Sequence, residues 1–250
     1  MLEPLFWFES AAHLQAGHVA TLDGPEGKHA AMVRRMRVGE AIQLSDGCGF
    51  RARGIVSSVG ASSLNAEIRE ATNDGEPTPA ITLVQALAKG DRDEQAVQAC
   101  TEAGITAVIP WQAEHSVSRW DSAKSAKNVV RWQTIATEAA KQSLRSWFPK
   151  VSEPVSTKEL VQMVGDFDVV LVLEPTAELN IAPRVWASGI DLQQAKIAVV
   201  IGPEGGISPR EIELFEEAGA WLVRLGAEVL RTSTAGIATV AILQNIAGNW

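Results

Sequence analysis

The chain has 250 residues, 46% hydrophobic and 21% charged, with a formal net charge of −8. These values indicate an ordinary globular protein of one large or two modest domains, and the acidic balance argues against a general nucleic-acid binder. No apolar run reaches the roughly 18 residues of a membrane span, and the N-terminus does not resemble a signal peptide. Cys48 and Cys100 lie far apart, without the spacing of a zinc or disulfide site. We therefore expect a cytoplasmic protein without a metal.

Residues 1–70 predict a β-rich unit, because apolar and polar residues alternate in AIQLSDGCGFRARGIVSSV and in SLNAEIREA. Asp46-Gly47 between two such runs indicates a hairpin, and several strands of this kind would form a short barrel or a curled sheet. Residues 71–80, ATNDGEPTPA, have the composition of a linker. We expect two domains, residues 1–74 and residues 75–250.

Arginines cluster in the first of these domains, at Arg34, Arg35, Arg37, Arg51 and Arg53. A local basic patch on an acidic protein can bind RNA phosphates while the remaining surface limits non-specific binding. The alternative is an ordinary solvated surface.

After residue 80 the pattern changes to buried strands alternating with helices. Continuous apolar runs predict strands at 81–87, 105–111, 167–175, 196–201 and 220–226, and helical spacing predicts helices at 93–104, 128–147, 208–219 and 234–248. This alternation is typical of a mainly parallel sheet in an α/β domain. In the helix predicted at 128–147, which we expect to end before Pro149, Glu138, Gln142 and Arg145 would share one face. They could contact RNA or a partner subunit, or form a salt bridge.

The strongest local motif is Gly202-Pro203-Glu204-Gly205-Gly206, which follows a predicted strand. Ser208, Pro209 and Glu211 then have the spacing of a helix N-cap with a capping box. Without side chains, the glycines would let a ligand lie against the backbone, although a tight connection without a ligand is the alternative. The loop is neither a Walker P-loop nor a G-x-G-x-x-G dinucleotide motif.

Two further loops end predicted strands. Leu173-Glu174-Pro175 is one, and Leu225-Gly226 with residues 228–235 is the other. Because ligands of open α/β sheets bind at the carboxyl ends of strands, we expect the three turns to meet at one sheet edge. An adenine could lie there in an apolar slot and bond to backbone groups.

The segments IGPEGGISPREIE and RLGAEVLRTSTA together resemble the C-terminal signature of the 16S rRNA uridine-N3 methyltransferases, which belong to the SPOUT class of enzymes dependent on S-adenosylmethionine (AdoMet). The resemblance extends over almost the whole chain, including residues 29–39 and 89–92. It implies a PUA-like RNA-binding barrel followed by an α/β domain with a trefoil knot that binds AdoMet. It also implies a homodimer, with the active site near the dimer interface, that methylates N3 of one uridine in 16S rRNA of the small ribosomal subunit.

The resemblance also assigns residues. The cofactor would be held by Leu173, Glu174, Pro175, Ile201, Gly202, Gly206, Leu225, Gly226, Val229, Leu230, Thr234 and Ala235. From its chemistry, Arg231 is the candidate catalytic residue, because a cation beside the cofactor loop would stabilise negative charge on the uracil oxygens; the alternative is an arginine that pairs with a surface acid. RNA would be bound by Arg34, Arg35, Arg37, Lys89, Arg92 and Arg145.

Two positions depart from the family pattern. Ser233 stands where the family often has Glu, and His115 where it often has Arg. A carboxylate at position 233 therefore cannot be the proton acceptor in this chain, so either the base lies elsewhere or none is needed beyond positioning and electrostatics. Three alternatives stay open: a non-catalytic RNA-binding or assembly factor, a methyltransferase of tRNA or another rRNA site, and a nucleotide-binding metabolic enzyme. The missing phosphate motifs disfavour the last.

Overall fold

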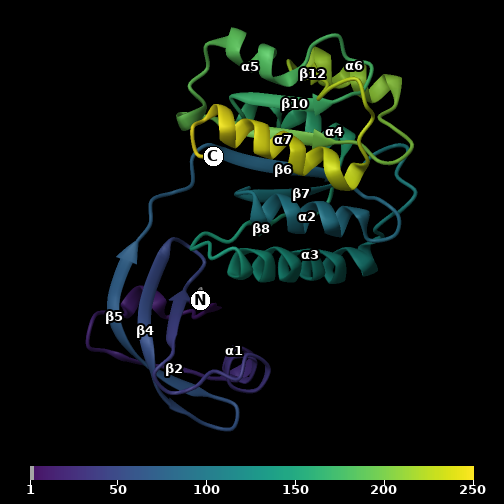
Figure 1. Cartoon of the computed structure of the whole chain (residues 1–250). Helices are drawn as coiled ribbons and strands as arrows, with labels where there is room; N and C mark the ends of the chain where they lie inside the picture. The colour runs from purple at the N-terminus through teal and green to yellow at the C-terminus, as the bar shows by residue number, and fades with distance from the viewer. Residues whose placement is uncertain (1–2) are drawn as a thin grey trace. The chain divides into compact units, whose positions relative to one another are not determined.

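The computed structural model describes residues 3–250, apart from the side chains of residues 122 and 123. The chain forms two compact units (Figure 1). Unit 1 comprises residues 1–76 and 140–148, and unit 2 comprises residues 77–139 and 149–250. No sequence signal pointed to the return of residues 140–148 to unit 1.

Unit 1 is built on a five-stranded sheet in the order β1-β3-β4-β5-β2. Its strands are β1 (Leu5–Trp7), β2 (Val19–Leu22), β3 (Ala41–Ser45), β4 (Phe50–Val59) and β5 (Leu64–Asn73). The register of β4 against β5 shifts at Arg53/Gly54 and again at Val56/Ser58, and such bulges bend a sheet. The concave side encloses a core that includes Phe6, Ile42 and Leu64. The predicted β-rich unit is confirmed.

The hairpin predicted at Asp46-Gly47 is also confirmed, since β3 and β4 pair antiparallel with Ser45 opposite Arg51. One Asp46 carboxylate oxygen accepts from the backbone N–H groups of Cys48 (2.7 Å) and Phe50 (3.2 Å). Sequence reasoning missed the helix α1 (Gly24–Lys28), which continues as the π-helical turn η2 (His29–Val33), and the short 3-10 helix η1 (Ala11–His13). Two glycines and a proline in GPEGK favour a turn, and this local signal concealed the helix.

Unit 2 contains a parallel sheet in the order β12-β10-β11-β6-β7-β8, with β9 also pairing β7. The strands are β6 (Ala80–Ala86), β7 (Ala107–Gln112), β8 (Lys150–Val151), β9 (Val155–Ser156), β10 (Val169–Leu173), β11 (Lys196–Ile201) and β12 (Trp221–Val223). The helices are α2 (Arg92–Glu102), α3 (Ser122–Gln142), α4 (Thr157–Gln162), α5 (Ile181–Ser188), α6 (Pro209–Glu217) and α7 (Thr232–Ile246), with 3-10 turns η3 (Val164–Asp166) and η4 (Leu192–Gln194). The predicted parallel α/β sheet is confirmed.

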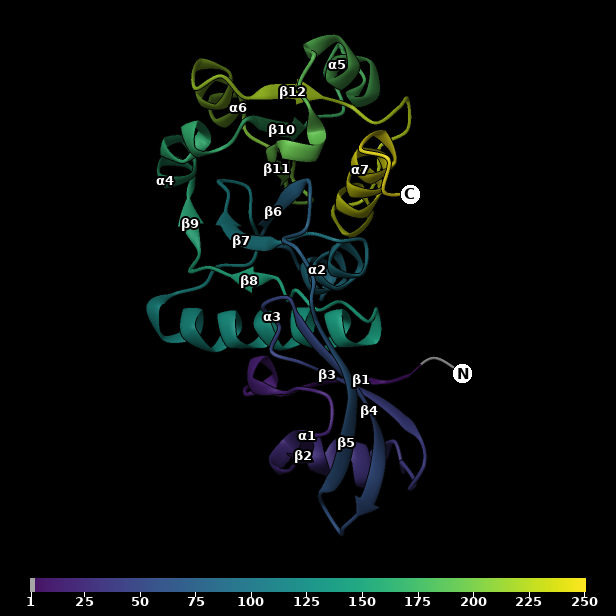
Figure 2. The same cartoon turned by 90° about the vertical axis from the view of Figure 1, so that its left-hand side faces the viewer.

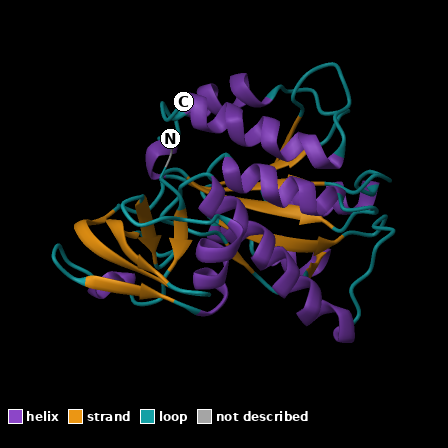
Figure 3. Cartoon of the chain, turned by 60° about the horizontal axis from the view of Figure 1, so that its bottom comes forward, coloured by secondary structure: helices purple, strands orange, loops and turns teal. Residues whose placement is uncertain are grey.

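Both faces of this sheet are buried, as the continuous apolar runs predicted. Along β11, Ile197 and Val199 belong to one hydrophobic cluster, whereas Ala198 and Val200 belong to another. Successive side chains of a strand point to opposite faces, so each cluster lies on one side of the sheet. Helices α2 and α7 lie on one side of the sheet and α4 and α6 on the other (Figure 2). Figure 3 shows most of the helices around the sheet of unit 2 and few beside the sheet of unit 1.

The helix predicted at 128–147 has different bounds. Helix α3 runs from Ser122 to Gln142, and Leu144 has a left-handed φ of 58°, which ends the helix well before Pro149. Arg145 therefore does not continue the helix face of Glu138 and Gln142, and that prediction was wrong. Among the described residues, none of the helices is long and apolar enough for a membrane span, and no three His, Cys, Asp or Glu side chains are grouped as a metal site would require.

Candidate functional site

Three neighbouring strands of unit 2 end at the same level. Leu173 of β10 is in register with Ile201 of β11 on one side and with Val223 of β12 on the other. Because the strands are parallel, the turns that follow them all leave at one edge of the sheet. The predicted meeting of the three turns is confirmed.

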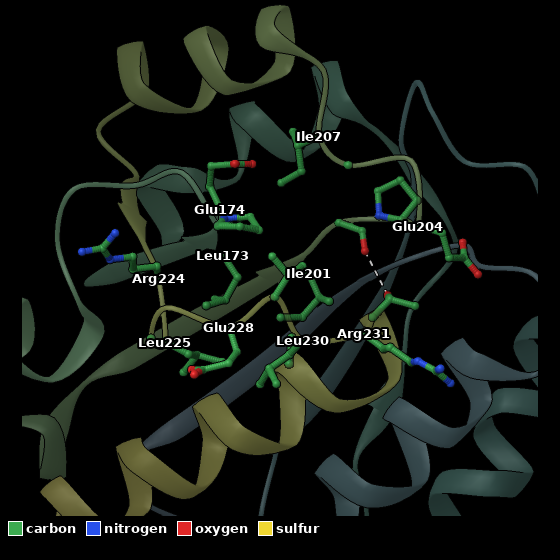
Figure 4. A pocket seen from close by; sticks show the side chains of 18 of the residues that line it. Leu173, Glu174, Ile201, Glu204, Ile207, Arg224, Leu225, Glu228, Leu230 and Arg231 are labelled. Carbon is green, nitrogen blue, oxygen red and sulfur yellow. Dashed lines mark hydrogen bonds between the residues drawn. The ribbon is translucent and has the colours of Figure 1, made fainter.

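These turns enclose a pocket of about 390 Å³ (Figure 4). Its walls combine apolar side chains, bare backbone and several charged side chains, mostly from the three turns and the start of α7. The lining residues are Arg92, Leu173, Glu174, Pro175, Ile201, Gly202, Pro203, Glu204, Gly206, Ile207, Arg224, Leu225, Gly226, Glu228, Val229, Leu230, Arg231, Thr232 and Ala235.

All residues assigned to the cofactor from the sequence line this pocket except Thr234. The Thr234 hydroxyl instead donates to the backbone oxygen of Arg231 at 3.1 Å. The residues that sequence reasoning missed are mostly direct neighbours of the assigned ones, such as Pro203, Ile207 and Thr232. A motif extended by one or two positions on each side would have found them.

The glycines of the three turns have different surroundings. A Cβ on Gly202 would lie 2.7 Å from Cγ1 of Ile207, and one on Gly205 would lie 3.1 Å from Cβ of His115. These two glycines therefore permit packing within the protein. Gly206 has a φ of 77° with open space around its Cβ position, and a Cβ on Gly226 would meet only Glu228 Oε2, at 3.5 Å. Gly202, Gly206 and Gly226 all line the pocket, so of these three it is Gly206 and Gly226 whose missing side chains leave open space rather than room for a protein neighbour.

A hydrogen-bond network fixes the glycine loop from its far side. The predicted capping box of α6 is present, with Ser208 as N-cap and Glu211 as its partner. The Glu211 carboxylate also accepts from the backbone N–H of Glu114 (2.9 Å) and the hydroxyl of Thr157 (2.6 Å), and the Ser208 hydroxyl donates to the Glu114 carboxylate (2.7 Å). Glu211 is 3% exposed, and a buried carboxylate satisfied by this many donors fixes the segments that carry them.

A second set of bonds joins the glycine loop to α7. The buried hydroxyl of Thr232 donates to the backbone oxygen of Gly202 at 2.9 Å, drawn as a dashed line in Figure 4. The side-chain amide of Gln85, at the end of β6, donates to the same hydroxyl at 2.9 Å. Since Thr232 follows Arg231, this chain of bonds sets the start of α7 beside the pocket.

Arg92 is held at the pocket rim by an ion pair with Glu204 (2.8 Å), whose carboxylate also accepts from the backbone N–H of Lys89 (3.1 Å). Desolvation alone would raise the pKa of Glu204, but the hydrogen bonds from its own N–H, Arg92 and Lys89 outweigh it, and the pKa is lowered. Arg92 is therefore an ion-paired part of the pocket rim, and its charge is shared with Glu204.

Arg231 is the N-cap of α7 and is exposed. Figure 4 shows its side chain extending outward from the rim, away from Leu225 and Leu230. Among the described residues it forms no ion pair within 4.0 Å, so its charge is available to a ligand at the pocket mouth. Ser233 is half-buried in the first turn of α7, and Nδ1 of His115 lies 3.2 Å from the backbone oxygen of Gly206.

The arginines of unit 1 divide into two groups. Arg34, Arg35 and Arg37 are exposed. Arg51 is instead bound by Asp74 (3.1 Å), by the Gln43 side chain (2.7 Å) and by a backbone oxygen, so it does not belong to an open basic patch. Arg145 is half-buried, and this burial lowers its pKa to about 10.

Residues 75–244 match the RNA methyltransferase domain, and residues 22–69 match the RNA methyltransferase PUA domain. The ribosomal RNA small subunit methyltransferases E of Mycobacterium bovis and Bacillus subtilis are 39% and 34% identical to this chain, over 100% and 86% of it and over 94% and 85% of their own lengths. Two solved structures are similar over 98% of both chains at 28% identity. One is the Legionella pneumophila putative methyltransferase in complex with its bound cofactor SAM (TM-score 0.86), and the other is the Neisseria gonorrhoeae ribosomal RNA small subunit methyltransferase E bound to S-adenosyl methionine (TM-score 0.84). The chain therefore belongs to the RNA methyltransferase family that includes ribosomal RNA small subunit methyltransferase E.

Proposed function

We propose that this chain is an AdoMet-dependent methyltransferase that methylates N3 of a uridine in 16S rRNA of the small ribosomal subunit. The observation that carries the proposal is the pocket at the ends of β10, β11 and β12, in a chain that aligns end to end with enzymes named for this class of reaction. Residues 75–250 would form the catalytic domain and residues 1–74 the RNA-binding domain.

The pocket residues fit AdoMet. A volume of about 390 Å³ lies within the range of small-molecule sites, roughly 300–1,000 Å³. Leu173, Ile201 and Leu225 offer apolar contact to an adenine, and the bare backbone at Gly206 and Gly226 allows close approach. The lining also holds both carboxylates and guanidinium groups, which suits a ligand that carries positive and negative charges together.

When bound, AdoMet supplies an activated methyl group on its sulfonium. The chain's own contribution is to hold the uracil N3 in line with that group, and positioning of this kind can lower a barrier by about 7–11 kcal/mol at best. The N3 proton would pass to solvent water, and Arg231 at the pocket mouth would stabilise the negative charge that spreads onto the uracil oxygens. Thr232, tied to Gly202 and Gln85, keeps Arg231 in place.

RNA contacts would come from Arg34, Arg35 and Arg37 of unit 1 and from the exposed Lys89 of unit 2. We expect the target base to leave its helix, because uracil N3 is hidden in a base pair. We also expect a cytoplasmic homodimer whose α/β domain contains a trefoil knot.

Two measurements test the proposal. Calorimetry with the purified protein should give an AdoMet affinity in the micromolar range or tighter, and mass spectrometry of 16S rRNA from cells that lack the protein should reveal one missing N3-methyluridine. Expression of the wild-type chain, but not of the Arg231→Ala variant, should restore it. AdoMet binding without a missing methyl group would favour the non-catalytic assembly factor. A methyl group missing from another RNA would redirect the substrate assignment.

A further inference from the structure

The end of η2 and the residues just after it expose a mixed apolar and basic surface that the cofactor pocket does not explain. Met32, Val33 and Val38 are 54%, 68% and 64% exposed. They flank the exposed Arg34, Arg35 and Arg37 along the chain. We call these six residues the knuckle.

The backbone holds the knuckle in one shape. Met36 is 5% exposed and lies in the core of unit 1, and its N–H donates to the backbone oxygen of Ala30 at 3.1 Å. The π-helical turn closes with a bond from Arg34 N–H to the His29 oxygen (2.9 Å), and Gly39 N–H bonds to the oxygen of Val56 (2.8 Å). Arg35 has a left-handed φ of 54°. Anchoring Met36 inside thus directs its neighbours outward, and the backbone beneath the surface is fixed before it binds.

The charges of the knuckle are not neutralised by the protein. Within the described residues, none of the three guanidinium groups lies within 4.0 Å of a carboxylate. The nearby Glu40 accepts from the backbone N–H of Arg37 at 3.0 Å. Three free cations beside one another on a chain of net charge −8 favour a polyanion as the occupant.

We propose that the knuckle binds an unpaired stretch of RNA, with its arginines on the phosphates and Met32, Val33 and Val38 against the faces of unstacked bases. Paired RNA presents phosphates and sugars at its surface and hides the base faces, so it would leave the three apolar side chains without a partner. Unpaired nucleotides present both chemistries side by side. The inference rests on the proposed function and specifies its RNA substrate as locally single-stranded.

The test uses the full-length protein and two probes, a short mixed-sequence RNA without secondary structure and a fully paired hairpin of the same length. Binding is followed by fluorescence anisotropy at several salt concentrations. The double variant Met32→Ser/Val33→Ser should lose about tenfold in affinity for the unpaired RNA, because burying an aliphatic side chain contributes about this much. Its affinity for the hairpin and its salt dependence should not change.

The double variant Arg34→Gln/Arg35→Gln should bind both probes more weakly. Its slope of log affinity against log salt on unpaired RNA should fall by about 1.4, since each phosphate contact contributes about 0.7. Val19→Ser, which changes a 59% exposed valine outside the knuckle, is the matched control and should bind as the wild type does.

Equal losses on both probes for Met32→Ser/Val33→Ser, or no loss on unpaired RNA, would overturn the proposal. Normal RNA binding combined with weaker binding to assembled small subunits would assign the knuckle to a protein partner and would overturn it as well. AdoMet calorimetry on the same samples separates this failure from that of the proposed function, because the knuckle variants should bind the cofactor normally.

Discussion

The bond between Thr232 and the glycine loop gives a quantitative prediction. The substitution Thr232→Val keeps the shape of a side chain that is 7% exposed but removes its hydroxyl. It thereby removes the bond to the Gly202 oxygen and the bond from Gln85, both 2.9 Å long. The Gln85 amide keeps its bond to the oxygen of Ala86 (3.0 Å), so part of the network survives.

Each buried polar group left without a partner costs about 1–3 kcal/mol, and we take about 2 kcal/mol for the pair of lost bonds. For a domain of this size, that lowers the melting temperature by about 4–8 °C. AdoMet affinity should fall about tenfold, equivalent to about 1.4 kcal/mol, because the glycine loop and the start of α7 would have to be ordered on binding.

The assays are thermal unfolding and AdoMet calorimetry on Thr232→Val, with Thr232→Ser as the control that keeps the hydroxyl. Thr232→Ser should retain most of both properties. If Thr232→Val melted and bound AdoMet as the wild type does, the bond would not position the pocket and the reasoning would be refuted.

Three further predictions concern Gly226, Glu204 and the two cysteines. Gly226→Val should abolish AdoMet binding, because the new side chain would fill part of the pocket. The melting temperature should not fall, because the Cβ would meet only Glu228 Oε2, at 3.5 Å. The control Gly165→Val, at an open position outside the pocket, should bind AdoMet normally. Glu204→Gln should lower the melting temperature at neutral pH, and the difference from the wild type should shrink as the pH falls below 4.5. The reason is that a carboxyl group with a lowered pKa stabilises the folded protein only while it is ionised. An equal difference at all pH values would contradict the ion pair. Burial raises the pKa of Cys100 to about 12, so a thiol reagent should label the exposed Cys48 in the native protein and reach Cys100 only after unfolding, which mass spectrometry of the labelled peptides can check.

The sequence predicted unit 2 better than unit 1. Apolar runs such as 81–87 and 196–201 predicted strands buried on both faces, and the structure places them there. In unit 1 the glycines of GPEGK are typical of a turn, but Asp23 at the N-cap and Pro25 in the first turn are also typical of a helix start, and the structure follows the second signal. The end of α3 was missed for a different reason, since a left-handed residue at Leu144 leaves no compositional signal.

Within the site, the sequence predicted which loops would meet, but not which of their residues contact other parts of the protein and which face open space. The motif made all its glycines equivalent, whereas their roles depend on the partner across the chain: Ile207 for Gly202 and His115 for Gly205. Likewise, Arg92 and Arg51 looked like free cations until the structure brought Glu204 and Asp74 beside them. Contacts between residues far apart in sequence decide such questions, and periodicity does not report them.

The start of α7 supports the proposal that the reaction proceeds without a carboxylate at position 233. Its N-cap is Arg231, whose side chain makes no capping bond, although Ser, Thr, Asp and Asn are the residues that normally stabilise this position. An N-terminus without a side-chain cap presents backbone N–H groups and the positive end of the helix dipole at the pocket rim. A glutamate in that first turn would have a lowered pKa and would accept a proton poorly. Ser233 adds no negative charge there, so the helix end and Arg231 act together on the anionic uracil that the proposed reaction requires.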